Sequence, residues 1–329
     1  MKAMRIHGHG GPEVFRCEEV DLPPPGPGEV RIRHGAIALN FSDVNVRRGG
    51  FYIAAPPKFP LILGNEGAGV VVTSNSSTFN AGDRVAYVGS GGPFYENTGS
   101  YAEERNLPDR VLLKLPVGIS ERTAAALMLK GLTASMVINR CHRPKPGETI
   151  LIHAAASGVG LLLVQWAKHL GAAVIGTVGS REKAQMIRLY GAEAILYRET
   201  DFVAEVKKIV PGGVAAVFDG VGRDTFHKSL DVVRPYGMLV NYGNASGHPE
   251  PLDLLLLAKN GSLFVARPGI HTHLSDPADL QRYSAELFDL VQREVLKVEI
   301  GRSYPLTEAA RAHRDMESRA FAGSAVLIP

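Results

Sequence analysis

The feature that most limits the possible folds is a regular alternation of strand-like and helix-like segments between residues 149 and 243. It begins with the apolar strand Thr149–Ala155 and the helix 159–170, and it ends with the strand 238–243. The segments between them are strands 173–178, 194–198 and 214–219 and helices 181–190, 202–209 and 224–233. Apolar strands that alternate with helices are typical of a parallel sheet covered by helices on both faces. The sequence therefore predicts an α/β unit with a doubly wound parallel sheet.

The first 120 residues follow a different pattern. They are rich in glycine and proline, and short strand-like segments are separated by turn residues, as in Val30–His34, Gly69–Thr73 and Arg84–Val88. This pattern predicts a compact, mostly antiparallel β domain, followed by a helix over about 121–140.

The last part of the chain does not continue the alternation. A strand over Ser262–Arg267 closes the predicted parallel sheet. It is followed by a long helix near 276–297, a β segment ending at Tyr304, a helix over 307–320 and the strand Ala325–Ile328. We expect these final elements to pack back onto the N-terminal domain. The predicted division of the chain is therefore 1–125, 126–265 and 266–329.

Charge and cysteine content exclude several classes of function. The net charge is only +3, and no run rich in lysine or arginine is interleaved with aromatic residues, which argues against nucleic acid and membrane surfaces as partners. No apolar run reaches the roughly 18 residues that a membrane span needs, and the start of the chain has no apolar stretch typical of a signal sequence. Cys17 and Cys141 cannot supply a disulfide framework or a four-thiolate zinc site. We therefore predict a cytoplasmic protein.

Two glycine-rich segments could each hold a phosphate, and their contexts distinguish them. AASGVG (155–160) follows the strand TILIHA and precedes the helix LLLVQWAKHLGA, whose polar residues Gln165, Lys168 and His169 share one narrow face. A loop between a strand and a packed helix directs backbone N–H groups at a dinucleotide pyrophosphate. Ala155 and Ser157 replace the first two glycines of the usual motif, so a tight turn without a ligand stays an alternative.

The other segment, GNEGAG (64–69), is followed by the strand VVVT and has no helix N-terminus to offer an anion. We expect it to be a β-bend where two backbones cross closely.

The end of the second strand bears on the choice between NAD and NADP. In IGTVGSREK no acidic residue lies between Gly176 and Ser180, where an NAD-binding unit places one to accept the ribose hydroxyls. Ser180 and Lys183 instead offer a hydroxyl and a cation suited to a 2′-phosphate. The sequence predicts NADP(H), and a solvated helix start is the alternative.

The stretch HAAASGVGLLLVQWAKHLGAAVIGTVG, together with LNFSDVNVRRG, KGLTA and ESRAFAGSAVLIP, resembles the quinone oxidoreductases, the zinc-free, zeta-crystallin-like branch of the medium-chain dehydrogenases/reductases. The resemblance extends from Met1 to Pro329. It implies a Rossmann domain with a doubly wound parallel sheet, inserted in a GroES-like, mostly antiparallel β domain that both ends of the chain form.

The same resemblance places GNEGAG at the position of a Gly-His-Glu segment whose histidine binds catalytic zinc. Here that residue is Asn65, and Ser42 stands near the expected cysteine ligand. Neither side chain belongs to the usual zinc ligand set. His271-Thr272-His273 is a close histidine pair with no obvious third ligand, and we expect it to lie in a loop. The resemblance therefore implies that the protein binds no metal ion.

The family's functional positions fall on particular residues of this chain. The resemblance implies that Asn40 orients the quinone oxygen, that Asp43 holds the surrounding network or contacts the cofactor, and that Tyr52 is a phenol donor. NADPH contacts are implied for Phe41, Ser42, Asp43, Thr133, Ser157, Gly158, Val159, Gly160, Gly179, Ser180, Lys183, Tyr197, Val221, Tyr242, Gly243, Asn244, Ala245, Phe264, Val265, Ala266 and Arg319. Thr133 is expected at the start of its helix, and Arg319 is expected on the C-terminal helix.

The implied activity is an NADPH-dependent, zinc-independent quinone oxidoreductase. Two alternatives stay open: an NADPH-dependent enone or 2-enoyl reductase, and a zeta-crystallin-like NADPH-binding protein with little turnover. The resemblance also implies a homodimer, and Ser262–Arg267 is a plausible edge strand for pairing across a two-fold axis.

Overall fold

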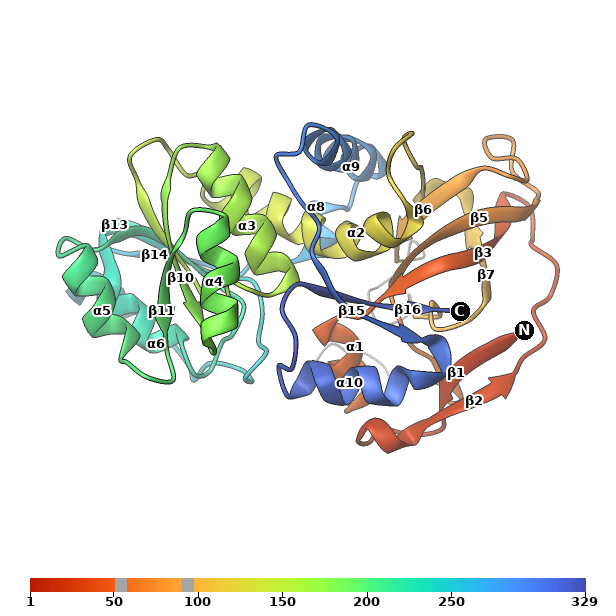
Figure 1. Cartoon of the computed structure of the whole chain (residues 1–329), viewed down its shortest axis with the longest axis horizontal. Helices are drawn as coiled ribbons and strands as arrows, with labels where there is room; N and C mark the ends of the chain where they lie inside the picture. Colours follow the sequence, from red (N-terminus) through yellow and green to blue (C-terminus); the bar gives the residue numbers. More distant parts are fainter. Residues whose placement is uncertain (51–57, 90–97) are drawn as a thin grey trace. The chain divides into compact units, whose positions relative to one another are not determined.

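The computed structural model describes residues 1–50, 58–89 and 98–329, and these form two compact units (Figure 1). The first unit comprises Met1–Leu129, Leu274–Gln292 and Val298–Pro329. The second unit comprises Lys130–His273 and Arg293–Lys297. Each unit has its own sheet and its own buried core.

The second unit contains a six-stranded parallel sheet in the order β11-β10-β9-β12-β13-β14. Its strands are β9 (Thr149–Ile152), β10 (Ala173–Val178), β11 (Glu193–Leu196), β12 (Val214–Asp219), β13 (Val233–Asn241) and β14 (Phe264–Ala266). Its helices are α3 (Gly158–His169), α4 (Arg181–Leu189), α5 (Phe202–Ile209), α6 (Phe226–Ser229), α7 (Leu254–Lys259) and α8 (Ile270–His273). The strand order reverses between β9 and β12, and such a switch point at the carboxyl ends is where open α/β sheets bind ligands. The predicted doubly wound parallel sheet is confirmed.

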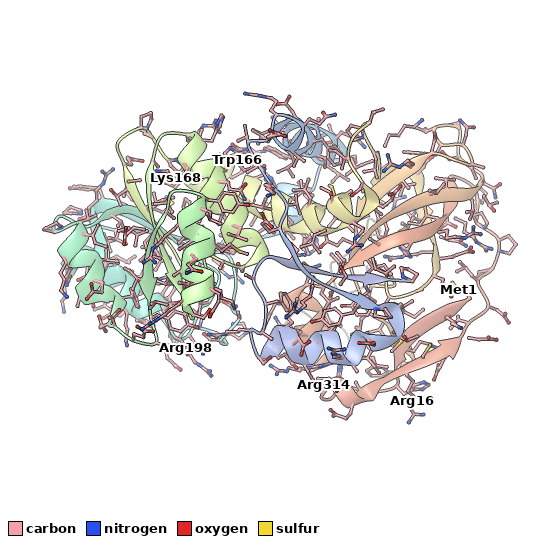
Figure 2. The ribbon with its side chains drawn as sticks, in the orientation of Figure 1. Met1, Arg16, Trp166, Lys168, Arg198 and Arg314 are labelled. Atoms are coloured by element: carbon pink, nitrogen blue, oxygen red, sulfur yellow. The ribbon has the colours of Figure 1, made fainter. Side chains whose placement is uncertain are left out.

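Helix α3 illustrates why the apolar segments pack against this sheet. Trp166 is buried, whereas Lys168 on the same helix is exposed (Figure 2). Gln165 lies on the predicted polar face but is buried as well. Its side chain accepts from the Lys297 N–H at 2.7 Å and donates to the Lys297 carbonyl at 3.1 Å, so the amide is satisfied without water.

Some predicted boundaries were wrong, and local backbone chemistry explains them. The helix expected over 224–233 is reduced to α6 and a 3-10 turn, Leu230–Val232, because β-branched Val233 and then Pro235 favour the extended strand β13. The helix expected to reach 297 is α9 (Pro277–Gln292), which ends just before Glu294 adopts a left-handed backbone with φ 59°. Residues 271–273, expected to be a loop, belong to the short helix α8, and α7 had not been predicted.

The described strands of the first unit form two sheets, with strand orders β2-β1-β4 and β15-β16-β3-β5-β6-β8, and β7 also pairs with β3. The strands are β1 (Lys2–Ile6), β2 (Phe15–Glu19), β3 (Glu29–Ala38), β4 (Leu61–Ile62), β5 (Glu66–Ser74), β6 (Arg84–Val88), β7 (Glu104–Pro108), β8 (Leu112–Lys114), β15 (Ile300–Pro305) and β16 (Ser324–Ile328). All pairs are antiparallel except β15 with β16. Through the pairing of β16 with β3, the C-terminal segment joins the N-terminal sheet.

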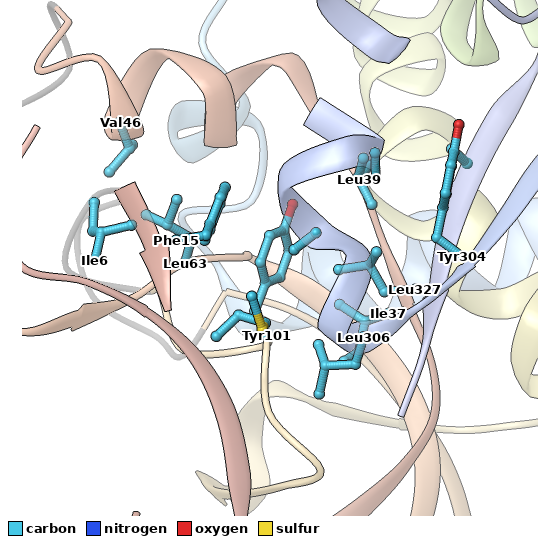
Figure 3. Close-up of a cluster of buried hydrophobic side chains, with 14 residues drawn as sticks. Ile6, Phe15, Ile37, Leu39, Val46, Leu63, Tyr101, Tyr304, Leu306 and Leu327 are labelled. Atoms are coloured by element: carbon cyan, nitrogen blue, oxygen red, sulfur yellow. The ribbon is translucent and has the colours of Figure 1, made fainter. Parts of the chain in front are cut away.

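The α-helices found among the described residues beside these sheets are α1 (Phe41–Arg47), α2 (Glu121–Met136), α9 and α10 (Ala309–Glu317). Helix α2 begins in the first unit and continues into the second, where a π-helical turn, Val137–Cys141, extends it. Helix α10 lies beside α1 and covers a core that includes Ile6, Phe15 and Tyr101 (Figures 1 and 3). In the described part of the chain, no helix is long and apolar enough to cross a bilayer.

The first two residues of GNEGAG, Gly64 and Asn65, lead into β5, and residues 66–69 already belong to that strand, so no helix follows the segment. Gly64 has a left-handed backbone with φ 92°, and a Cβ atom on Gly69 would lie 1.9 Å from the Arg33 carbonyl oxygen. The pairing of β3 with β5 is irregular beside this point, between His34 and Ala36. The expected close crossing of two backbones is therefore present.

Candidate functional site

The turn between β9 and α3 presents backbone donors at the carboxyl edge of the parallel sheet. Ser157 caps α3, and its hydroxyl accepts from the Gly160 N–H at 3.0 Å. No described residue accepts from the N–H of Gly158 or Val159. A Cβ atom on Gly160 would lie 2.3 Å from the Ala154 carbonyl oxygen, so only glycine lets the helix approach the strand this closely.

The next strand–helix turn, between β10 and α4, is also capped by a serine. The Ser180 hydroxyl accepts from the Lys183 N–H at 3.4 Å. A Cβ atom on Gly179 would lie 2.8 Å from the Tyr197 hydroxyl, so these two predicted residues are neighbours. Ser180 also hydrogen-bonds the exposed Glu182, and this bond lowers the pKa of the Glu182 carboxyl. Glu182 lies just beyond the stretch whose lack of acids had favoured NADP.

The ends of β12 and β13 form a single hydrogen-bonded corner. Buried Asp219 accepts from the N–H groups of Val221 at 2.8 Å and Gly222 at 3.2 Å, and it accepts from the Thr225 hydroxyl at 2.9 Å. The Tyr242 N–H donates to the Asp219 carbonyl at 2.9 Å. This corner places Val221 beside the predicted turn 242–245.

That turn, Tyr242-Gly243-Asn244-Ala245, follows β13 directly. Burial raises the pKa of the Tyr242 hydroxyl, which is therefore neutral. The Ala245 N–H donates to the Gly220 carbonyl at 3.2 Å. Asn244 Oδ1 is buried and has no hydrogen-bond partner among the described residues. An acceptor in that state favours a ligand that donates to it.

Three other predicted positions differ in their surroundings. In the segment Phe264-Val265-Ala266, Ala266 pairs with Val240 near the carboxyl edge, whereas Phe264 is 54% exposed on the edge strand. Thr133 was expected at the start of its helix, which was wrong: α2 begins at Glu121, so Thr133 lies in its last turn. The expectation that Arg319 lies on the C-terminal helix was also wrong, since α10 ends at Glu317 and Arg319 follows with φ 58°.

In the first unit, Asn40 and Asp43 lie at the N-terminus of α1, where the predicted Phe41 and Ser42 also lie. Asn40 is the N-cap, and its backbone N–H donates to Asp43 Oδ2 at 3.0 Å. Its side-chain Nδ2 donates to Glu66 Oε1 at 2.7 Å. Glu66 is fully buried, and its other oxygen accepts from the Leu129 N–H at 2.5 Å. The carboxylates of Asp43 and Glu66 therefore both hydrogen-bond Asn40 at the start of α1.

Asp43 is the centre of this polar cluster. Its Oδ1 accepts from Asn65 Nδ2 at 3.0 Å, and its Oδ2 also accepts from the Tyr101 hydroxyl at 3.0 Å. The side chains of Asp43, Asn65 and Tyr101 are buried. Two polar atoms beside it, Asn65 Oδ1 and Ser42 Oγ, are buried and have no hydrogen-bond partner in the described part of the chain. Tyr52, the third predicted catalytic residue, lies outside the described residues.

Glu66, Tyr101 and the partner of Tyr101, His313, were not identified from the sequence. Tyr101 and His313 are 212 positions apart, and no short-range motif links either of them to Asp43. Glu66 follows Asn65 in the GNEGAG segment, so the signal that drew attention to Asn65 also pointed to it.

Comparison with known proteins agrees with this architecture. The alcohol dehydrogenase GroES-like domain model matches residues 26–117, and the zinc-binding dehydrogenase model matches residues 158–281. A quinone oxidoreductase of Pseudomonas aeruginosa is 44% identical, and the match covers 100% of this chain and 99% of that protein. This chain belongs to the quinone oxidoreductase family of the medium-chain dehydrogenases/reductases.

Two further relatives are informative within this family. The solved structure of Escherichia coli quinone oxidoreductase complexed with NADPH is 40% identical, with a TM-score of 0.93 over 100% of both chains. A 2-haloacrylate reductase of a Burkholderia species is 41% identical, covering 98% of this chain and 98% of that protein. The predicted combination of a Rossmann domain and a GroES-like domain is thus confirmed.

One of the matching models describes zinc-binding dehydrogenases, and the residues of this chain do not fit a catalytic zinc. Asn65 directs an amide N–H, not a lone pair, at Asp43, and Asn40 does the same toward Glu66. The amide nitrogens that donate these hydrogen bonds have no lone pair for a metal ion, and a neutral amide oxygen such as Asn65 Oδ1 is not among the usual zinc ligands. Among the described residues, no three His, Cys, Asp or Glu side chains are grouped so that they could hold a metal ion.

Proposed function

We propose that this chain is an NADPH-dependent quinone oxidoreductase that transfers hydride to a quinone without a metal ion. The observation that carries the proposal is the full-length similarity to the E. coli quinone oxidoreductase solved with NADPH, at 40% identity and a TM-score of 0.93. Similarity of this extent includes both the nucleotide-binding unit and the unit that holds Asn40 and Asp43.

Unpartnered polar groups support NADPH as the cofactor. The N–H groups of Gly158 and Val159 and the adjoining α3 dipole suit the diphosphate. Asn244 Oδ1 suits the donor side of the nicotinamide carboxamide, and Ser42 Oγ suits a ribose hydroxyl. Each of these atoms would gain a hydrogen bond from the cofactor that the described residues do not provide.

The preference for a 2′-phosphate depends on the turn between β10 and α4. Lys183 brings a cation and Ser180 a hydroxyl to this turn, and Tyr197 adjoins Gly179. We include Arg319 as a second cation for the phosphate. Glu182 opposes an anion at the same turn, so Lys183 and Arg319 must outweigh its charge for NADPH to be preferred.

The acceptor side requires hydrogen-bond donors more than a metal. When bound, NADPH supplies the hydride, and the reduced quinone oxygen then carries negative charge that N–H or O–H donors stabilise. We assign Asn40 to orient the quinone, Asp43 to hold Asn40 in place, and Tyr52 to donate from its phenol. The bonds from Asn40 to Glu66 and Asp43 support a rigid Asn40, which such orientation needs.

The proposal is tested by stopped-flow measurement of NADPH oxidation with 1,4-benzoquinone and with larger quinones. We expect enzyme-dependent oxidation that saturates with quinone and is faster with NADPH than with NADH. Failure of every quinone to accelerate NADPH oxidation, in a preparation shown by titration to bind NADPH, would refute the activity while leaving the cofactor assignment intact.

A second candidate is reduction of an activated carbon–carbon double bond, and the 41% identity to a 2-haloacrylate reductase favours it. That reaction adds a proton at carbon and needs an acid placed near the carbon that receives it. A parallel assay with 2-chloroacrylate, an alkenal and a crotonyl thioester separates the candidates. Turnover of these compounds at a higher kcat/KM than any quinone would replace the first proposal with the second.

We also propose a cytoplasmic homodimer. The edge strand β14 exposes Phe264, and α7 exposes Leu254 (73%) and Leu255 (63%), an apolar combination that pairing with a second copy would cover. Sedimentation equilibrium of the parent and of Phe264→Asp tests this. A dimer that the substitution converts to monomer supports β14 as the interface, and an unchanged dimer contradicts it.

A further inference from the structure

A chain of buried side chains leads from Asp43 to the C-terminal helix α10. The Tyr101 hydroxyl donates to Asp43 Oδ2, and the Tyr101 hydroxyl oxygen lies 3.0 Å from Nε2 of His313 on α10. None of the three side chains exposes more than 1% of its surface. The C-terminal segment therefore takes part in the polar cluster at the start of α1.

The direction of each hydrogen bond in this chain is fixed. Tyr101 has one hydroxyl proton, which it gives to Asp43, so its oxygen accepts from the His313 Nε2–H. Burial, aided by the nearby Arg47 guanidinium, lowers the pKa of His313 to about 3. Burial beside Asp43 raises the pKa of Tyr101 well above its ordinary value. Both groups are neutral at physiological pH and act as donors, not as proton carriers.

Packing holds the two rings in place. Phe15 stacks on Tyr101 with ring centroids 6.1 Å apart and meets His313 edge-on at 4.8 Å, and Figure 3 shows Phe15 and Tyr101 in this core. A second contact joins the same two helices, because Glu317 of α10 pairs with Arg47 and with Arg48 at the end of α1. Helix α1 is thus tied to α10 at both of its ends.

We propose that Tyr101 and His313 are positioning residues for the acceptor-binding centre formed by Asn40 and Asp43. Asp43 Oδ2 accepts from both Tyr101 and the Asn40 backbone, so the orientation of this carboxylate sets the position of the α1 N-terminus. The Asn40 side chain moves with that N-terminus. The identity of the acceptor rests on the proposed function, but the positioning role does not.

The test compares two buried tyrosines of the same unit. Tyr101→Phe removes the hydroxyl from Asp43 and keeps the ring. Tyr87→Phe is the matched control, since the fully buried Tyr87 hydroxyl lies 2.7 Å from His34 Nε2 and 2.8 Å from Ser100 Oγ. We expect both variants to lower Tm. We expect only Tyr101→Phe to lower kcat, by about tenfold, with the KM for NADPH unchanged.

Variants of His313 distinguish positioning from packing. A glutamine amide can donate to the Tyr101 oxygen, whereas leucine cannot. We expect His313→Leu to lower kcat as Tyr101→Phe does, and His313→Gln to regain part of the loss. Equal kcat values for the glutamine and leucine variants would contradict a role through the hydrogen bond.

Crystal structures of the parent, Tyr101→Phe and Tyr87→Phe provide a readout that does not depend on turnover. The expected result is a rotated Asp43 carboxylate and a shifted Asn40 amide in Tyr101→Phe alone. If the parent does not oxidise NADPH with quinones, the proposed function fails, and these structures still decide the positioning role. Unmoved Asp43 and Asn40 in Tyr101→Phe would overturn it.

Discussion

Replacing Gly160 by alanine tests how closely the nucleotide-binding helix must approach its strand. A Cβ atom there would lie 2.3 Å from the Ala154 carbonyl oxygen and 2.8 Å from two backbone atoms of Ala155, about 1 Å short of ordinary van der Waals contact. All three neighbouring atoms are backbone, so a side-chain rotation cannot relieve the overlap. The N-terminus of α3 must move away from the turn that carries Gly158.

The magnitude follows from what that movement weakens. Overpacking of this kind costs about 1–3 kcal/mol of folding free energy. A displaced N-terminus also loses at least one hydrogen bond from a backbone N–H to the charged diphosphate, worth about 1.5–3 kcal/mol. Since about 1.4 kcal/mol is a factor of ten in binding, we expect the Kd for NADPH to rise about 10- to 100-fold.

Calorimetric titration with NADPH measures the Kd, and Gly237→Ala is the matched control. A Cβ atom on Gly237 would meet the Ala215 and Arg234 carbonyl oxygens at 2.9 Å, so it also strains the backbone of this unit, but it does so near the amino end of β12. We expect both variants to lose stability and only Gly160→Ala to lose affinity. Equal Kd values for Gly160→Ala and the parent would refute the assignment of this turn to the diphosphate.

Other predictions concern cofactor choice and pH. Lys183→Ala should raise the KM for NADPH about tenfold and leave the KM for NADH unchanged, because it removes one half-buried cation that faces the 2′-phosphate. Arg188→Ala, on the exposed face of the same helix, should change neither constant. Steady-state kinetics with both cofactors measures this, and equal losses for NADPH and NADH would contradict the role of Lys183. The pKa of buried His313 falls to about 3 on folding, so below pH 6.5 the unfolded chain binds a proton that the folded chain does not. The stability that neutral His313 contributes is therefore present above pH 6.5 and is lost as the pH falls toward 3. We expect the free energy of unfolding to fall by about 2 kcal/mol between pH 7 and pH 5. Urea unfolding at both pH values should show a smaller loss for His313→Gln than for the parent, and an equal loss would mean that His313 is not buried in its neutral form.

The alternation of apolar strands and helices made the parallel sheet predictable, because each strand and helix reveals its buried face by its own periodicity. Element ends were less predictable. The left-handed backbone of Glu294 that ends α9 is set by the surrounding structure and has no local glycine signal. Gln165 shows the same limit, since its burial depends on Lys297, which is 132 positions away.

The candidate site was predictable where residues are close in sequence. The turn 157–160 is local and could be recognised from residue type and spacing, whereas Asn40 and Asp43, which form a local cap, were implied by the family resemblance. The contacts of Asp43 with Asn65 and Tyr101 cross between elements and depend on the pairing of strands. His313 comes from the far end of the chain, so only the fold reveals its place in the cluster.

The most direct test of the central claim is the zinc dependence of quinone reduction. Zinc content is measured by plasma mass spectrometry before and after exhaustive chelation, and NADPH oxidation with 1,4-benzoquinone is measured on the same samples. We expect substoichiometric zinc and the same kcat before and after chelation. A stoichiometric zinc ion whose removal abolishes turnover and whose return restores it would contradict metal-independent hydride transfer.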